Sequence, residues 1–243
     1  MAQKILITGF KGGTGATTFA VWLGRALAAS GERTLVVDGD DKCGCAEIIG
    51  NCRDRIVYTL ADYAKSACRA KQTLVSHPKD ANLSFMPTLG LTDFSAVKRA
   101  IADVDGLFDY ILTDKTGESC CDRALIVTEP YPASIKSADA CRSYLTDGGI
   151  KDVALVVNKL SAAAILNGET MTAHEIASLL HLRLAAVIPE DLLIAADRPK
   201  PATVKAYKAA AENITGKRES VFNVFGGMGG VNGYFKRKLR QKI

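Results

Sequence analysis

The sequence predicts an α/β fold, a doubly wound and mostly parallel sheet of about seven strands with helices on both faces. Two observations lead to this prediction. Short apolar runs alternate with longer amphipathic runs along nearly the whole chain, which is typical of strand–helix units joined by right-handed crossovers. Most of the apolar runs are continuous rather than broken by polar residues, as expected for strands that are buried on both faces.

The apolar runs place the strands, and the amphipathic runs between them place the helices. The expected strands are residues 4–8, 34–38, 83–86, 110–114, 124–128, 153–158 and 185–188. The expected helices are residues 16–30, 59–70, 93–104, 134–145, 172–180 and 202–213. Ligands of such sheets bind at the carboxyl ends of the strands, so polar residues near these ends are the candidates for chemistry.

The composition is that of an ordinary globular protein, with 243 residues, 48% hydrophobic and 23% charged. The chain shows no internal repeat and no low-complexity linker, so we expect one domain over residues 1–225 and a short tail over residues 226–243. No apolar run reaches the roughly 18 residues of a membrane span, and the chain enters its first strand without a signal-peptide pattern.

The cysteines give little indication of a metal site. There are seven, an odd number, and they are scattered along the chain. Neither Cys43 with Cys45 nor the adjacent pair Cys120 and Cys121 has the spacing of a zinc site or of a CxxC redox pair. We therefore expect reduced thiols that are packed in the fold.

Residues 9–18 form the most informative segment, with the sequence Gly-Phe-Lys-Gly-Gly-Thr-Gly-Ala-Thr-Thr between a strand and a helix. Its glycines allow a tight loop whose N–H groups point at phosphate oxygens, and the helix N-terminus adds donors and a favourable dipole. The hydroxyl of Thr17 is placed to ligate Mg²⁺. The predicted phosphate-binding residues are Gly12, Gly13, Thr14, Gly15, Ala16, Thr17 and Thr18.

The loop departs from the usual phosphate-binding motif at one position. That motif ends in Gly-Lys-Thr or Gly-Lys-Ser, whereas this chain has Ala16 in the place of the lysine. With Lys11 upstream, the segment resembles the Lys-Gly-Gly-x-Gly-Lys-Thr-Thr loop of the MinD/ParA family of deviant Walker A P-loop ATPases. The resemblance implies ATP and Mg²⁺ as cofactors, an ATP-dependent homodimer, and a catalytic Lys11 that reaches the partner's nucleotide.

Two further segments resemble the family's catalytic motifs. Asp38 and Asp40 follow the second strand like the Asp-x-Asp of the first switch, which implies that Asp40 organises the attacking water and Asp38 supports the metal from outside. Asp114 ends an apolar strand like the Walker B aspartate and would hold Mg²⁺ through water, opposite Thr17. The expected metal site therefore comprises Thr17, Asp38 and Asp114.

The segments expected beside the nucleotide base come later in the chain. Asn158 lies in Val-Val-Asn-Lys, which resembles the family segment whose asparagine reads adenine. Pro189 and Asp191 lie in Ile-Pro-Glu-Asp, similar to the loop beside the base. This loop and the order of the motifs favour the MinD branch over the DNA-partitioning ParA branch.

Ala16 is expected to slow hydrolysis, because losing one cation near the transferring phosphoryl group costs several kcal/mol, or roughly 10²–10³-fold in rate. Three explanations stay open: natural degeneration to a nucleotide-sensing switch, an engineered substitution, and slow catalysis sustained by Lys11. The segment after Asp114 also lacks the family's proline-containing second switch and looks too short for its helix. This second departure favours natural divergence and puts coupling to partners in question.

The net charge of +5 is a property of the tail, because the last eight residues hold five basic residues and no acid. Apolar residues recur there every four positions, so a helix would have a narrow apolar edge and a cationic surround, similar to the membrane-targeting helix of the MinD branch. The expected membrane contacts are Tyr234, Phe235, Leu239, Ile243, Lys236, Arg237 and Lys238. The alternatives are a solvated basic terminus, a helix packed on the body, and nucleic-acid binding, which the neutral body disfavours.

The resemblance implies a MinD-like ATP switch that dimerises with ATP, attaches to the anionic cytoplasmic face of the cell membrane and helps to place the division site with MinC- or MinE-like partners. The alternative is a non-hydrolysing scaffold for polar localisation of pilus or flagellar machinery, which Ala16 and the short second switch favour. An iron–sulfur reductase component is a third class, but adjacent Cys120 and Cys121 make poor ligands for one symmetric cluster.

Overall fold

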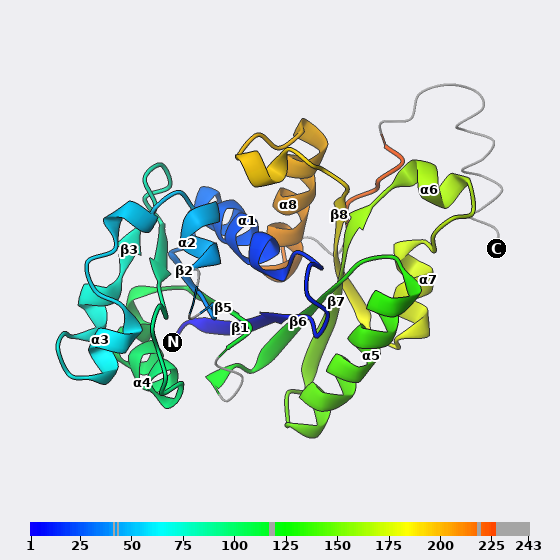
Figure 1. The fold of residues 1–243 in the computed structure, drawn as a ribbon. Helices are drawn as coiled ribbons and strands as arrows, with labels where there is room; N and C mark the ends of the chain where they lie inside the picture. The colour runs from blue at the N-terminus through cyan, green and yellow to red at the C-terminus, as the bar shows by residue number, and fades with distance from the viewer. Residues whose placement is uncertain (41, 43, 117–119, 218–219, 227–243) are drawn as a thin grey trace.

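The computed structural model describes residues 1–40, 42, 44–116, 120–217 and 220–226. One sheet runs through the molecule, with helices on either side (Figure 1). Its strands are β1 Gln3–Thr8, β2 Thr34–Val37, β3 Val75–Ser76, β4 Leu83–Met86, β5 Tyr110–Asp114, β6 Arg123–Thr128, β7 Asp152–Leu160 and β8 Arg183–Pro189. The α-helices are α1 Ala16–Ala29, α2 Cys45–Ile49, α3 Leu60–Ala64, α4 Ser95–Val104, α5 Pro132–Asp147, α6 Ala162–Leu166, α7 Ala173–Leu179 and α8 Pro201–Ile214.

The sheet has eight strands in the order β3-β4-β2-β5-β1-β6-β7-β8. Every neighbouring pair is parallel except β3 with β4, which is antiparallel. The doubly wound, mostly parallel sheet is thus confirmed. Because β1 lies between β5 and β6, the loop that follows β1 leaves the sheet at its centre, next to the ends of both neighbours.

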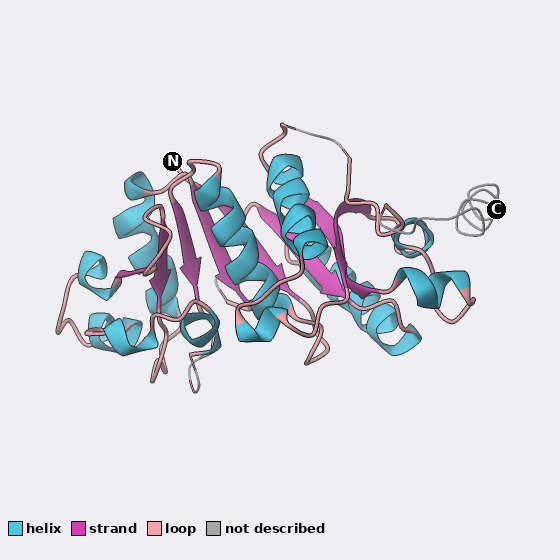
Figure 2. Ribbon diagram, turned by 90° about the horizontal axis from the view of Figure 1, so that it is seen from above, coloured by secondary structure: helices cyan, strands magenta, loops and turns pink. Residues whose placement is uncertain are grey.

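The helices form two layers. Helices α1, α2 and α8 share one hydrophobic cluster with the sheet, while α3 and α4 belong to a second cluster and α5 and α7 to a third. Figure 1 shows α1 and α8 on one side of the sheet and α4 and α5 on the other. Figure 2, turned to look down on the first layer, shows its helices lying over the strands.

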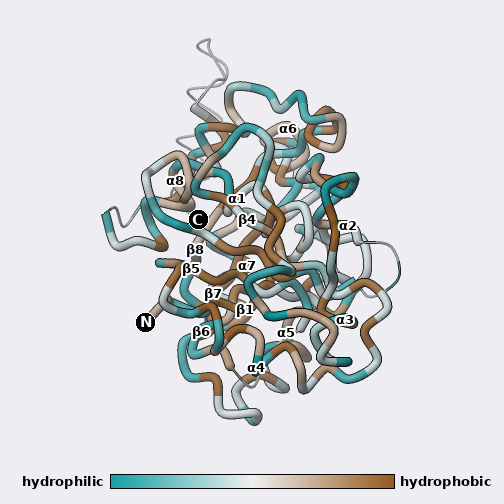
Figure 3. Tube along the Cα trace, turned by 90° about the vertical axis from the view of Figure 1, so that its left-hand side faces the viewer, coloured by the Kyte–Doolittle hydropathy of each residue, from teal (hydrophilic) through white to brown (hydrophobic). Residues whose placement is uncertain are grey.

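Helix α1 is held rigidly against the sheet by side chains at helical spacing. Phe19, Leu23 and Leu27 are all fully buried, and burial of such side chains contributes roughly 1.5–3 kcal/mol each. The apolar strands gather in the middle of the molecule in the hydropathy view (Figure 3). The first turn of α1, which follows the phosphate loop, is therefore fixed relative to the strand ends.

The structure differs from the sequence prediction in the short elements. The helix expected over residues 59–70 ends at Ala64, because Ser66 adopts a left-handed backbone with φ of 60° that a helix cannot continue through. Helices α2 and α6 and strand β3 were not predicted. Each is too short to give a clear hydrophobic period.

The predicted tail lies almost wholly outside the described residues, which end at Gly226. The seven residues predicted to contact a membrane are all in this part of the chain. Within the described residues, no helix combines the length and the apolar character needed to cross a bilayer.

Candidate nucleotide site

Polar side chains from separate strands meet around residues 9–18, which we call the phosphate loop. Asp38 follows β2, Asp114 ends β5, Glu129 follows β6, and Asn158 lies near the end of β7. Since these strands are parallel neighbours in the sheet, their carboxyl ends face one edge. The phosphate loop leaves β1 at the same edge, and the site is built around it.

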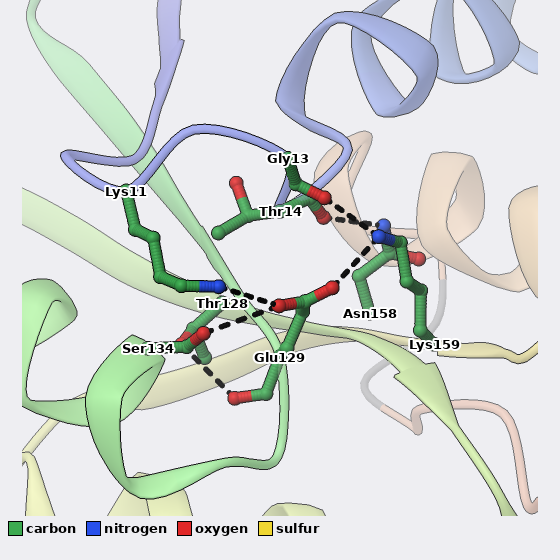
Figure 4. Close-up of polar contacts among 8 residues, drawn as sticks. All are labelled: Lys11, Gly13, Thr14, Thr128, Glu129, Ser134, Asn158 and Lys159. Carbon is green, nitrogen blue, oxygen red and sulfur yellow. Dashed lines mark hydrogen bonds and ion pairs between the residues drawn. The ribbon is translucent and has the colours of Figure 1, made fainter.

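Two glycines of the phosphate loop have backbone conformations that other residues rarely adopt. Gly13 has φ of 84° and Gly15 has φ of 87°. A Cβ on Gly15 would also collide with the side-chain nitrogen of Asn158. That nitrogen donates a 2.8 Å hydrogen bond to the carbonyl of Thr14 (Figure 4), so Asn158 fixes the loop from the sheet side.

The start of α1 is bound to the end of β5 by a short hydrogen bond. The hydroxyl of Thr17 donates to Oδ2 of Asp114 over 2.6 Å. Asp114 is fully buried, and burial raises its pKa to about 6, although nearby Lys115 and the hydrogen bond from Thr17 act in the opposite direction. Two of the three residues predicted to hold a metal, Thr17 and Asp114, are thus in contact.

The side chains of Thr17 and Asp114 fit a hydrated Mg²⁺ ion. Oδ1 of Asp114 has no hydrogen-bond partner among the described residues and is buried beside the loop. An unpaired buried carboxylate oxygen is unfavourable in the protein alone. A metal-bound water would satisfy it, and Thr17 Oγ1 offers a direct oxygen ligand of the kind that Mg²⁺ prefers.

Asp38 and Asp40 organise the loop after β2. Asp38 is fully buried, and its two carboxylate oxygens accept the backbone N–H groups of Asp40 at 2.9 Å and Ala46 at 2.8 Å. Asp40 accepts the thiol of Cys45 at 2.8 Å. Asp38 therefore supports the segment that carries Asp40, while the outer support of the metal expected of Asp38 and the contact of Asp40 with the attacking water stay predictions.

Glu129 holds two lysines beside the phosphate loop (Figure 4). Its carboxylate is 3.2 Å from Nζ of Lys11 and 2.7 Å from Nζ of Lys159, and Ser134 Oγ donates to it over 3.2 Å. Burial raises the pKa of Glu129, but the hydrogen bonds from Lys159 and Lys11 outweigh burial and hold the pKa below its ordinary value. Lys159 also donates to the carbonyl of Gly13 over 2.6 Å.

Two of the residues expected beside the base, Pro189 and Asp191, lie at the end of β8 and on the loop that follows it. Pro189 ends this strand, and Asp191 is buried. The carboxylate of Asp191 accepts the backbone N–H of Leu193 at 3.0 Å, that of Lys200 at 2.7 Å and the hydroxyl of Thr203 at 2.7 Å. Asp191 thereby shapes this loop and fastens it to the start of α8; its contact with a nucleotide stays a prediction.

Comparison with known proteins identifies the family. The model of the CobQ/CobB/MinD/ParA nucleotide binding domain matches residues 5–201 of the chain. The chain belongs to this family. It is 30% identical to the septum site-determining protein MinD of Bacillus subtilis, a match that spans 89% of this chain and 90% of that protein.

Solved structures of other members of the MinD/ParA family share the fold. MinD in a MinC:MinD complex from Aquifex aeolicus superposes with a TM-score of 0.82 at 24% identity, covering 89% of this chain and 97% of that chain. The MinD protein of Pyrococcus horikoshii complexed with Mg-ADP superposes with a TM-score of 0.77 at 21% identity, covering 88% and 96%. The α/β architecture is therefore that of MinD structures.

Three charged residues around the phosphate loop were not predicted from the sequence: Lys115, Glu129 and Lys159. Each stands at or directly after the carboxyl end of a central strand, so position alone could have drawn attention to them. Their pairing could not have been deduced, because it depends on which side chains turn toward the loop.

Replacement of Asp114 with Asn should raise the stability of the protein without nucleotide. The pKa of Asp114 rises from 3.8 to about 6 on folding, so the stabilisation from its protonated form is complete below pH 4 and is lost as the pH rises through 6. Asp114→Asn should therefore increase the free energy of unfolding by about 1–3 kcal/mol at pH 8, with a smaller gain toward pH 4.

Urea unfolding at both pH values measures this gain, and Asp122→Asn is the control because Asp122 is an exposed acid in the same region. Equal effects of the two substitutions at pH 8 would contradict the buried, desolvated state of Asp114.

Proposed function

We propose that this protein is a MinD-like ATP-binding switch that holds a nucleotide more effectively than it hydrolyses one. The hydrogen bond between Thr17 and Asp114 carries the proposal, because it joins the magnesium hydroxyl of the phosphate loop to the buried carboxylate of β5. The two left-handed glycines of the loop support it, since they turn successive N–H groups toward one point.

ATP and Mg²⁺ are the proposed cofactors. The N–H groups of residues 12–18 and the N-terminus of α1 would bind the phosphates, with Thr17 and Asp114 holding the metal, which neutralises charge on the phosphates. Asp38 would support the metal from outside, Asp40 would order the attacking water, and Asn158, Pro189 and Asp191 would lie near the base. The relative from Pyrococcus horikoshii is described as complexed with Mg-ADP.

We expect weak hydrolysis because one of the family's two loop lysines is absent and the other is held in an ion pair. Ala16 is almost fully buried at the start of α1 and provides no charge to a β- or γ-phosphate. Lys11, the proposed catalytic lysine, is paired with Glu129 at 3.2 Å. It would have to leave this ion pair to reach the nucleotide of a second subunit.

The proposed biological role is placement of the division site, in the manner implied by the septum site-determining relatives. ATP would bring two copies together, and the basic tail over residues 226–243 would then attach the dimer to the anionic cytoplasmic face of the membrane. Two tails bind more firmly than one because the second attachment is intramolecular. The Aquifex aeolicus MinD was solved with MinC, and a MinC-like partner is proposed for this chain.

A second candidate is a non-hydrolysing scaffold of the same family that localises pilus or flagellar machinery at a cell pole. Ala16 favours this candidate, since a scaffold needs nucleotide binding without turnover. The membrane-targeting pattern of the tail favours the division-site role.

Restoring the loop lysine should accelerate hydrolysis. Ala16→Lys adds a cation at the β- and γ-phosphates, and we expect steady-state phosphate release to increase roughly 10–10³-fold. Ala16→Met is the matched control, because it adds a side chain of similar length without charge. Equally brisk phosphate release from the unaltered chain and Ala16→Lys would contradict the proposed weak turnover.

Deletion of residues 231–243 should abolish binding to anionic vesicles. Each basic residue near an anionic surface contributes about 1 kcal/mol, and the tail holds five of them. Co-sedimentation with phosphatidylglycerol vesicles in the presence of ATP measures the effect, with neutral phosphatidylcholine vesicles as the control. Unchanged sedimentation after the deletion would refute the membrane role of the tail.

A further inference from the structure

Lys115 carries a cation to the start of α1 from a different part of the fold. It directly follows β5, and its backbone N–H donates to the carbonyl of Ile7 over 3.0 Å, which continues the pairing of β5 with β1. From this position its Nζ donates to Oγ1 of Thr17 over 3.1 Å and lies 4.0 Å from Oδ2 of Asp114. The ammonium group of Lys115 therefore contacts Thr17, the residue that directly follows the uncharged Ala16.

We propose that Lys115 binds the β- or γ-phosphate of the nucleotide and replaces the ground-state binding contact of the lysine that is missing at position 16. The inference rests on the proposed binding of a nucleoside triphosphate and adds the residue that supplies its phosphate-binding cation. The ligand class is a polyphosphate, because a lysine ammonium acts on phosphate oxygens as a compact charge with three donors.

The ammonium of Lys115 has donor capacity left for a ligand. Among the described residues it makes one hydrogen bond, to Thr17, and one longer ion pair, to Asp114. Half of its side chain is exposed, so the head group borders solvent at the loop, and the flexible four-carbon stem allows it to shift toward a bound phosphate.

Lys115 also differs from the other lysines at the site in the acid that it pairs with. Lys11 and Lys159 share the carboxylate of Glu129 at 3.2 and 2.7 Å. Among the described residues, Lys115 forms its ion pair with Asp114, whose charge a magnesium ion would take up. A divalent cation at Thr17 and Asp114 would repel the ammonium, and the adjacent phosphate oxygens would then be its acceptors.

The backbone of Lys115 is held in an unusual conformation. Its φ of 57° is in the left-handed region, which a residue with a Cβ occupies only at a conformational cost. The hydrogen bond to Ile7 holds this conformation. The left-handed turn directs the side chain to the phosphate loop instead of along the continuation of β5.

Equilibrium binding of Mg-ATP tests the proposal without relying on turnover. Lys115→Met should weaken binding by about 10–100-fold, the effect of removing one charge-assisted hydrogen bond, at a urea concentration where unfolding curves show the variant to be fully folded. Lys205→Met is the control, because Lys205 is exposed on α8, and it should bind like the unaltered chain. Lys115→Met combined with Ala16→Lys should regain affinity, since a cation returns to the phosphates.

Three results would overturn the proposal. Equal affinities of the unaltered chain and Lys115→Met would exclude a phosphate contact, and a folded double variant that binds no better than Lys115→Met would exclude the replacement of position 16. Failure of the unaltered chain to bind Mg-ATP at all would overturn both this inference and the proposed function.

Discussion

The hydrogen bond from Thr17 to Asp114 is the contact on which the site depends. It joins the first turn of α1 to the end of a central strand at 2.6 Å, and both partners are buried. On the other side of Asp114, Gly39 just after β2 lies against its carbonyl, where a Cβ would collide with the backbone, so the loop after β2 packs closely on the end of β5. The loop, the candidate metal ligands and the first switch are therefore assembled by the packing of the sheet.

Charge balance is the second organising feature. The phosphate loop has cations on two sides without a lysine of its own at position 16: Lys11 and Lys159 on the side of Glu129, and Lys115 on the side of Asp114. Glu129 is held ionised by its two lysines, whereas buried Asp114 has a raised pKa. An anionic ligand would be attracted to this site, and a hydrated divalent cation would provide a partner for Oδ1 of Asp114, which has none among the described residues.

The long strands and helices could be predicted because they are built from long, regular patterns. The strand expected at residues 110–114 is found as β5 Tyr110–Asp114, and the helix expected at residues 16–30 is found as α1 Ala16–Ala29. The helix expected at residues 59–70 was too long, since the left-handed backbone at Ser66 depends on local packing that a hydrophobic pattern does not encode.

The site was predictable only where a motif was present. The glycine loop, Thr17 and the acids after β2 and β5 were found from their order and spacing. Glu129 and Lys115 belong to no motif, and their roles depend on side-chain directions that the fold sets. Asp191 was expected to lie beside the base, and its three hydrogen bonds within its own loop and to α8 show a structural task that the motif did not indicate.

The proposed function requires that the phosphate loop binds ATP and hydrolyses it slowly. A single-turnover experiment tests this most directly: excess protein is mixed with labelled ATP and Mg²⁺, and bound nucleotide and released phosphate are followed in the same sample. ATP should be bound fully, while phosphate should appear at least about 10²-fold more slowly than binding is completed. Absence of bound ATP, or phosphate release that keeps pace with binding, would contradict it.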